Sequence, residues 1–346
     1  MTTALMGGLV LFLFIGAAAL FIAKKAKISR TTSMLGLPLI IWLILYLLKK
    51  INIELPLAKY ANMPSVFSIP VFWNIILFLI SLAVFSYFYT LTLEKKNVIL
   101  GNYIFSVILI TTLLTLMFGT GLFKIFLLLA LAIACIEGKI HKHESRINPA
   151  ITLVLAAMLI DFTSLFSFGT GILTSLGLGL VVGIILMRIL KQYYHKILSP
   201  LIVLIALCIT HFAAPQLEAS SIISVATIGF MYSRSRIKNK NNLDQYLSKI
   251  FNLTLPYLVL VLAILVYPPG GIHFYVFAAL LFIISVRWKP QRKLRDALIS
   301  PRGIAMASVL LLLLLNYNQE YILFISIVGY LVLLLSVIIS DFTQKI

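Results

Sequence analysis

The sequence contains little charge, and very little of that charge is acidic. Charged residues make up 11% of the 346 positions, whereas a soluble globular protein carries about 25%. Hydrophobic residues make up 62%, and they recur in long runs from one end of the chain to the other. A soluble globular fold is therefore excluded, and the composition predicts an all-α membrane protein that crosses the bilayer many times.

Residues that hold metals, cofactors or nucleotides are also scarce. Both cysteines, Cys135 and Cys208, lie in apolar runs and indicate neither a disulfide framework nor a metal site. His141 and His143 stand beside Glu144, but a charged, solvated loop explains this better than a metal site. The glycine-rich stretch GTGILTSLGLGLVVG has no following lysine, so we interpret it as a surface for close helix packing rather than a phosphate loop. No catalytic triad is visible, and we expect no metal, no cofactor and no enzyme activity.

Apolar runs bounded by charge, glycine or proline give thirteen candidate membrane spans. Several are shorter than the roughly 20 residues of a straight span, which suggests that some helices are interrupted. The candidate spans are Ala4–Ala23, Met34–Leu48, Pro70–Leu91, Val98–Phe118, Leu122–Ile136, Ala150–Leu165, Ile172–Leu190, Leu198–Ala214, Leu217–Tyr232, Phe251–Tyr267, Ile272–Val286, Ala297–Leu315 and Tyr321–Ile339.

Lys and Arg alternate between the two sets of connections that join these spans. Taking every second connection, one set holds 23 of the 28 basic residues. The other set holds only Lys49, Lys50, Lys59 and Lys124, and Arg302 lies within a span. The positive-inside rule then predicts an external N-terminus and a cytoplasmic C-terminus. Basic loops against an anionic leaflet explain the net charge of +18, so we expect a lipid bilayer as partner and no nucleic acid.

One acid, Asp161, lies inside a predicted span. If the span is helical from Ala150, a rise of about 1.5 Å per residue places Asp161 roughly 16 Å deep, near the middle of a hydrocarbon core about 30 Å thick. An acid at that depth costs a few kcal/mol, and such acids usually face a cavity, pair with a cation or carry ions. Asp161 is therefore the first candidate for function, and a structural acid hydrogen-bonded between helices is the alternative. Thr163 and Ser164 offer nearby oxygen ligands for a hard cation.

Two stretches predict interrupted helices. Pro301 and Gly303 flank Arg302, so the helix is expected to break there and free backbone groups to line a site. The alternative is that Arg302 reaches the lipid phosphates from about 8 Å inside the cytoplasmic end. Glu137, followed by a glycine, marks a second possible break, and a solvated acid at the membrane boundary is the alternative there.

The chain resembles the membrane domain of the monovalent cation:proton antiporter superfamily, the sodium/hydrogen exchanger fold, as a divergent member. The opening GLVLFLFIGAAALFIAKKAKISRTTSMLGLPLI is similar to that family's first two spans and basic turn, and NIILFLISLAVFSYFYTLTLEKKNVI to its third span. AAMLIDFTSLF resembles the helix with the ion- and proton-binding aspartate, which falls on Asp161. ALISPRGIAMASVLLLLL resembles one of two crossed, unwound helices, with Arg302 at its arginine, and IEG places Glu137 at the acid of the other. The sequence departs from the family at Ile160 and Ala156, where the family often has polar or acidic residues.

The resemblance implies an inverted-repeat fold with about 13 transmembrane helices and a possible homodimer. We expect a single transmembrane domain over residues 1–346, with halves at about 1–165 and 198–340 linked by the span 172–190 and no soluble domain. The stretch Ser233–Ile250 is expected to be an interfacial amphipathic piece or a linker. The implied function is exchange of a monovalent cation for protons in a bacterial plasma membrane, with Arg302 balancing charge. A non-transporting protein of this fold and a membrane glycan polymerase or ligase are the alternatives.

Overall fold

The structure, a computed structural model, describes most but not all of the chain. The described residues are 2–26, 28–50, 70–89, 97–118, 122–135, 139–140, 143–144, 147–161, 165–237, 239–266, 281, 303–316 and 320–345. They are almost entirely helical, which confirms the all-α class, and the only strand pair among them is the two-residue hairpin β1 (Lys139–Ile140) and β2 (His143–Glu144). Within the described part, three helical stretches are long and apolar enough to cross a membrane, namely Phe72–Tyr89, Phe168–Gln192 and Lys240–Leu265.

The chain forms two compact units, and the first combines residues 1–76 with residues 256–346. Its helices are α1 (Thr2–Ala26), α2 (Arg30–Lys50), the start of α4 (Pro70–Tyr89), α12 (Pro256–Leu265), α15 (Ile304–Asn316) and α16 (Glu320–Lys345). Helix α2 packs against α1, α12 and α16, and α15 packs against α12 and α16. Every side chain from Ala305 to Leu313 is buried, so α15 forms the core of this unit.

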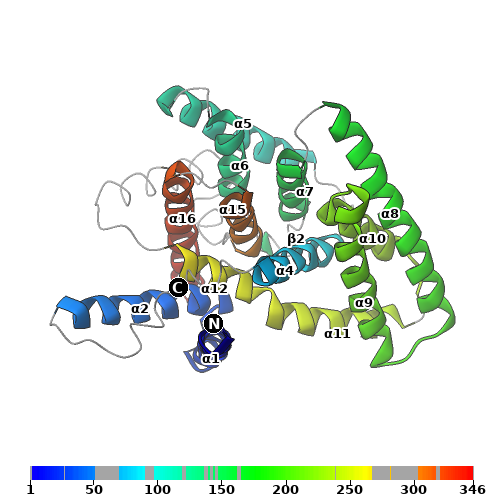
Figure 1. Ribbon diagram of the computed structural model, residues 1–346, viewed down its shortest axis with the longest axis horizontal. Coiled ribbons are helices and arrows are strands. Elements are labelled where there is room, and N and C mark those ends of the chain that lie inside the picture. Colours follow the sequence, from blue (N-terminus) through cyan, green and yellow to red (C-terminus); the bar gives the residue numbers. More distant parts are fainter. Residues whose placement is uncertain are drawn as a thin grey trace. The chain divides into compact units, whose positions relative to one another are not determined.

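The second unit comprises residues 77–255 and contains the remaining helices. They are the rest of α4, α5 (Asn97–Phe118), α6 (Phe123–Ala134), α7 (Ile147–Asp161), α8 (Leu165–Gln192), α9 (Leu198–Ala213), α10 (Ser221–Arg234) and α11 (Lys240–Thr254). Helix α10 packs against α7, α8 and α9, whose green ribbons surround it in Figure 1. This position matters because Ser220, the residue before α10, lines the cavity of the candidate site.

Two glycines of α8 confirm the close helix packing predicted for the glycine-rich stretch. A Cβ at Gly179 would lie 2.5 Å from the Ser224 carbonyl oxygen, and one at Gly183 would lie 2.6 Å from the Met231 sulfur, both on α10. At Gly169 and Gly177 a Cβ would meet nothing within 4 Å, so these two positions do not serve the contact. Glycine is therefore required where α8 crosses α10 and not along the whole helix.

The basic stretch before α12 folds as an amphipathic helix, as predicted. Leu243, Leu247 and Phe251 recur every four residues on α11, and all three are buried. Lys240 donates hydrogen bonds to the carbonyl oxygens of Tyr232 (3.0 Å) and Ser233 (2.6 Å), at the end of α10 where a cation offsets the helix dipole. Helix α11 ends at Thr254 because Pro256, with no N–H to donate, begins α12.

The expected sixth and seventh spans, Ala150–Leu165 and Ile172–Leu190, correspond to α7 and α8. Helix α7 is described as far as Asp161 and α8 from Leu165, and residues 162–164 between them lie outside the described residues. Helix α8 begins seven residues before the expected span because no charged residue marks its start. The eleventh predicted span, Ile272–Val286, lies outside the described residues except for Leu281.

Candidate functional site

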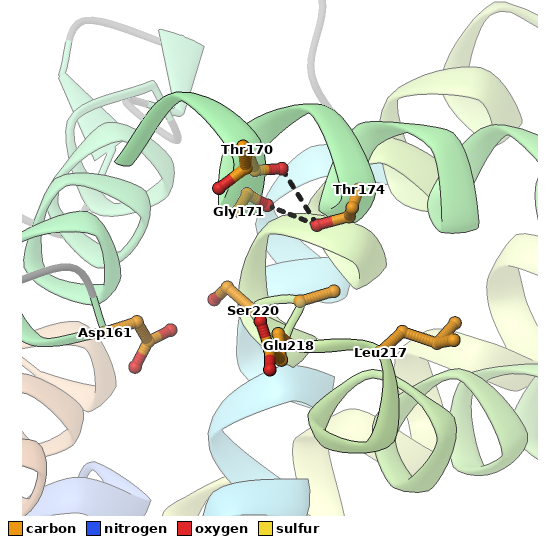
Figure 2. A pocket seen from close by; sticks show the side chains of 8 residues that line it. Asp161, Thr170, Gly171, Thr174, Leu217, Glu218 and Ser220 are labelled. Carbon is orange, nitrogen blue, oxygen red and sulfur yellow. Dashed lines mark hydrogen bonds between the residues drawn. The ribbon is translucent and has the colours of Figure 1, made fainter. Parts of the chain in front are cut away.

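A polar cavity of about 330 Å³ lies where α7 ends, α8 begins and α9 connects to α10. Figure 2 shows the side chains that line it, with the Asp161 carboxylate on one wall and the α9–α10 connection opposite. Helix α8 contributes Thr170, Gly171 and Thr174, and the connection contributes residues 217–220. The cavity brings together segments that are about 60 residues apart in the sequence, from Asp161 to Ser220.

Asp161 is the last described residue of α7. With α7 beginning at Ile147, the aspartate lies about 21 Å along the helix at the usual rise per residue. Its side chain is exposed to the cavity, although protein surrounds the carboxylate on most sides.

The α8 wall of the cavity is held by its own hydroxyl groups. The Thr174 Oγ1 atom donates to the carbonyl oxygens of Thr170 (3.0 Å) and Gly171 (3.1 Å), as the dashed lines in Figure 2 show. Ser175, which is fully buried one residue further on, donates to the Gly171 carbonyl oxygen at 2.5 Å. These bonds fix the first turns of α8 against the cavity.

The opposite wall is a short, well-bonded connection between α9 and α10. A single 3₁₀ turn, Pro215–Leu217, is closed by hydrogen bonds from Leu217 N to Ala214 O (3.0 Å) and from Glu218 N to Pro215 O (3.2 Å). The following N–H group, that of Ala219, also donates to Ala214 O (2.9 Å). Glu218 itself adopts a left-handed backbone conformation with φ of 52°, which is uncommon for a residue other than glycine. Its exposed side chain lines the cavity.

Ser220 joins the two walls and faces Asp161. Its backbone N–H donates to the Ser175 Oγ atom on α8 at 2.7 Å, while its own side chain is 3% exposed. The Ser220 Oγ atom has no hydrogen-bond partner of good geometry within the described part of the chain, yet it interacts with the Asp161 carboxylate. Figure 2 shows the two side chains on opposing sides of the cavity. Because Ser220 also precedes the first turn of α10, the positive end of that helix dipole is directed toward the same space.

Lys124, in the first turn of α6, is a positive charge that acts on the site. Its half-buried amino group attracts the Asp161 carboxylate electrostatically, although it does not line the cavity. An amino group that attracts the carboxylate without covering it leaves room for a second cation. In the sequence Lys124 stood out only as one of the few basic residues on the predicted outer side.

The structure places one of the predicted site residues in this cavity. Asp161 lines it, whereas Thr163, Ser164, Glu137 and Arg302 lie outside the described residues. The predicted site lacks four polar side chains that the fold brings to Asp161, namely Thr170, Thr174, Glu218 and Ser220. An acid in a short connection between two apolar runs was the one available signal, and it pointed to Glu218.

His211, a second titratable side chain in an apolar run, makes the hydrogen bond expected of a structural histidine. It is buried in α9, and its Nδ1 atom lies 3.1 Å from the Ser81 Oγ atom of α4. Phe78 and Phe212 pack against the ring with centroids 5.5 and 5.2 Å away. Within the described ranges, no three His, Cys, Asp or Glu side chains cluster as metal ligands would.

Comparisons with known proteins support the fold through structure and not through sequence. No family model matches the chain, and no curated protein matches it in sequence. The structure of the sodium proton antiporter MjNhaP1 from Methanocaldococcus jannaschii at pH 8 matches with a TM-score of 0.71 and 16% identity, covering 98% of this chain and 99% of that one. A structure of the same antiporter from an electron-microscopy map matches with a TM-score of 0.67 and 16% identity, covering 98% and 96%. Over almost its whole length, the chain therefore has the sodium/proton antiporter fold.

Proposed function

We infer that this protein is a secondary transporter that exchanges a monovalent cation, Na⁺ or K⁺, for protons. The observation that carries the proposal is the cavity, in which the Asp161 carboxylate faces and interacts with the buried Ser220 hydroxyl. The other polar groups around it are the Glu218 carboxylate and the hydroxyls of Thr170 and Thr174. Oxygen atoms are the ligands that hard cations prefer. The antiporter fold supplies the second support, because it is the fold of two structures named as sodium proton antiporters.

Exchange follows from competition at one carboxylate. Ionised Asp161 attracts a cation, and the Ser220 hydroxyl adds an oxygen ligand opposite it. A proton that binds Asp161 removes the charge that holds the cation, so the two ions occupy the site in turn. Lys124 supplies balancing charge while Asp161 is ionised and empty. Coupling therefore needs no cofactor and no covalent step.

The direction of access follows from the positive-inside topology. In that topology the end of α7, the start of α8 and the α9–α10 connection lie on the outer side of the membrane. The cavity is then the outward-open form of the site, and the transport cycle alternates it with a form open to the cytoplasm. Thr163 and Ser164 belong to the proposal as further oxygen ligands, and Arg302 and Glu137 as charges at interrupted helices. A bacterial plasma membrane, with the C-terminus inside, is the proposed location.

Flux measured in proteoliposomes tests this function. Purified protein is reconstituted with a pH-sensitive dye inside the vesicles, and Na⁺ or K⁺ is added outside. We expect the wild type to dissipate a proton gradient in a cation-dependent manner and Asp161→Asn to match empty vesicles. Asp244→Asn serves as the matched control, because Asp244 accepts a hydrogen bond from Tyr232 (2.8 Å) away from the cavity and asparagine keeps that acceptor. Full exchange by Asp161→Asn would contradict the proposed role.

The same assay distinguishes exchange from one alternative, a protein of this fold that does not transport. Ala156, fully buried in α7, and the neighbouring Ile160 provide no polar group near Asp161, which fits a protein of this fold that has lost transport. Such a protein would show no cation-dependent proton flux in the wild type under any cation tested.

A further inference from the structure

The α9–α10 connection holds a second carboxylate, Glu218, in the cavity of Asp161. Both acids line the same space of about 330 Å³, and no Lys, Arg or His is among the described residues that line it. The chain as a whole has a net charge of +18, but the two acids give this cavity a local negative charge. Low-dielectric walls around such a cavity focus its field and concentrate cations in it.

The position of Glu218 is fixed by the chain around it. Its backbone, with φ of 52°, is held between the 3₁₀ turn and the Ala219-to-Ala214 hydrogen bond. Two residues later, Ser220 N bonds to Ser175 on α8 at 2.7 Å and thereby ties the connection to the opposite wall. A strained backbone persists only where its surroundings determine it, and such positions cluster at binding sites. The backbone of Glu218 is thus fixed by its surroundings, and its exposed side chain extends from it along the cavity.

A separate observation indicates that the cavity receives a ligand. The Ser220 Oγ atom is buried and lines the cavity, and apart from its interaction with the Asp161 carboxylate it has no hydrogen-bond partner of good geometry among the described residues. A buried hydroxyl without a well-formed hydrogen bond costs free energy, and a cation in the cavity would satisfy its oxygen. Two carboxylates and this hydroxyl offer oxygen ligands from opposing walls.

We propose that Glu218 is a cation-binding residue that captures the incoming monovalent cation at the mouth of the cavity and keeps it there while Asp161 is protonated. This inference rests on the proposed exchange at Asp161 and extends it. With Asp161 neutral, Glu218 is the remaining negative charge among the described lining residues, so the cation stays within reach until the proton leaves. Glu218 therefore sets the cation affinity, whereas Asp161 carries the exchange.

The decisive variants are Glu218→Gln and the charge swap Gln216→Glu with Glu218→Gln. Gln216 lies in the same turn, is exposed and does not line the cavity, so the swap keeps the charge of the connection but moves it out of the site. Proton flux at varied external Na⁺ and K⁺ gives KM and maximal rate for each variant. Cation-induced thermal stabilisation of the purified protein gives the half-saturating concentration without requiring transport.

For Glu218→Gln we expect both KM and the half-saturating cation concentration to rise about tenfold, which corresponds to about 1.4 kcal/mol of binding free energy. The factor by which KM rises should exceed the factor by which the maximal rate falls. The swap should behave like Glu218→Gln. Recovery of wild-type KM by the swap would mean that only the surface potential matters, and it would overturn the inference. So would an unchanged half-saturating concentration in Glu218→Gln, whether or not the protein transports. A wild type without cation-dependent flux that still binds cations through Glu218 would refute the exchange function alone.

Discussion

Two glycines of α8 look alike in the sequence, but replacing each of them by alanine should affect stability differently. At Gly179, a Cβ would lie 2.5 Å from the Ser224 carbonyl oxygen and 2.7 Å from the Thr227 Cβ atom, both on α10. Backbone atoms cannot turn aside, so Gly179→Ala must push α8 and α10 apart. At Gly177, two residues earlier, the added Cβ would meet nothing within 4 Å.

The magnitude follows from two opposing effects. Alanine is favoured over glycine inside a helix by about 1 kcal/mol, and both variants gain this equally. Overpacking a close contact costs about 1–3 kcal/mol, and only Gly179→Ala incurs it. The difference between the two variants thus isolates the contact. Since about 1 kcal/mol shifts the melting temperature by about 2–4 °C in a unit of this size, we expect Gly179→Ala to melt several degrees below Gly177→Ala.

Thermal unfolding of the two purified variants in detergent, followed by intrinsic fluorescence, measures this difference. The transport assay gives a second measurement. Ser220, the residue before α10, lines the cavity, so a displaced α10 should slow exchange in Gly179→Ala only. Equal melting temperatures, or a lower one for Gly177→Ala, would refute the reasoning that α8 and α10 meet through Gly179.

Two further predictions concern the groups that hold the cavity. Ser175→Ala removes the partner of the buried Ser220 N–H group and should cost about 1–3 kcal/mol of stability. Thr174→Ala loses only bonds to its own helix and should cost less in the same melting experiment. The reverse order would contradict the role given to Ser175. Lys124→Gln removes the amino group that competes with a bound cation for Asp161 and should lower the cation KM in the flux assay, whereas a raised KM would show that Lys124 does not compete.

Much of the helical framework was predictable from hydropathy. The expected spans Pro70–Leu91 and Leu198–Ala214 differ by at most two residues at either end from α4 and α9, because charged or turn-forming residues bound them. The stretch Ser233–Ile250, expected to be an amphipathic piece or a linker, contains most of the amphipathic α11. The start of α8 at Leu165, seven residues before the expected span Ile172–Leu190, was not predictable, since no charged residue marks it.

What the sequence determined by itself is the membrane class, the alternation of basic connections and the presence of an acid, Asp161, within an apolar run. These are properties of local composition, which decides whether a segment leaves water for lipid. Tertiary structure alone decided which groups face that acid: Ser220 and Glu218 from the α9–α10 connection, and Lys124 from α6. Their distance along the chain carries no information about proximity, because packing of α7, α8 and α10 brings them together. An intramembrane acid can be recognised from its neighbours in sequence, but its function depends on its neighbours in space.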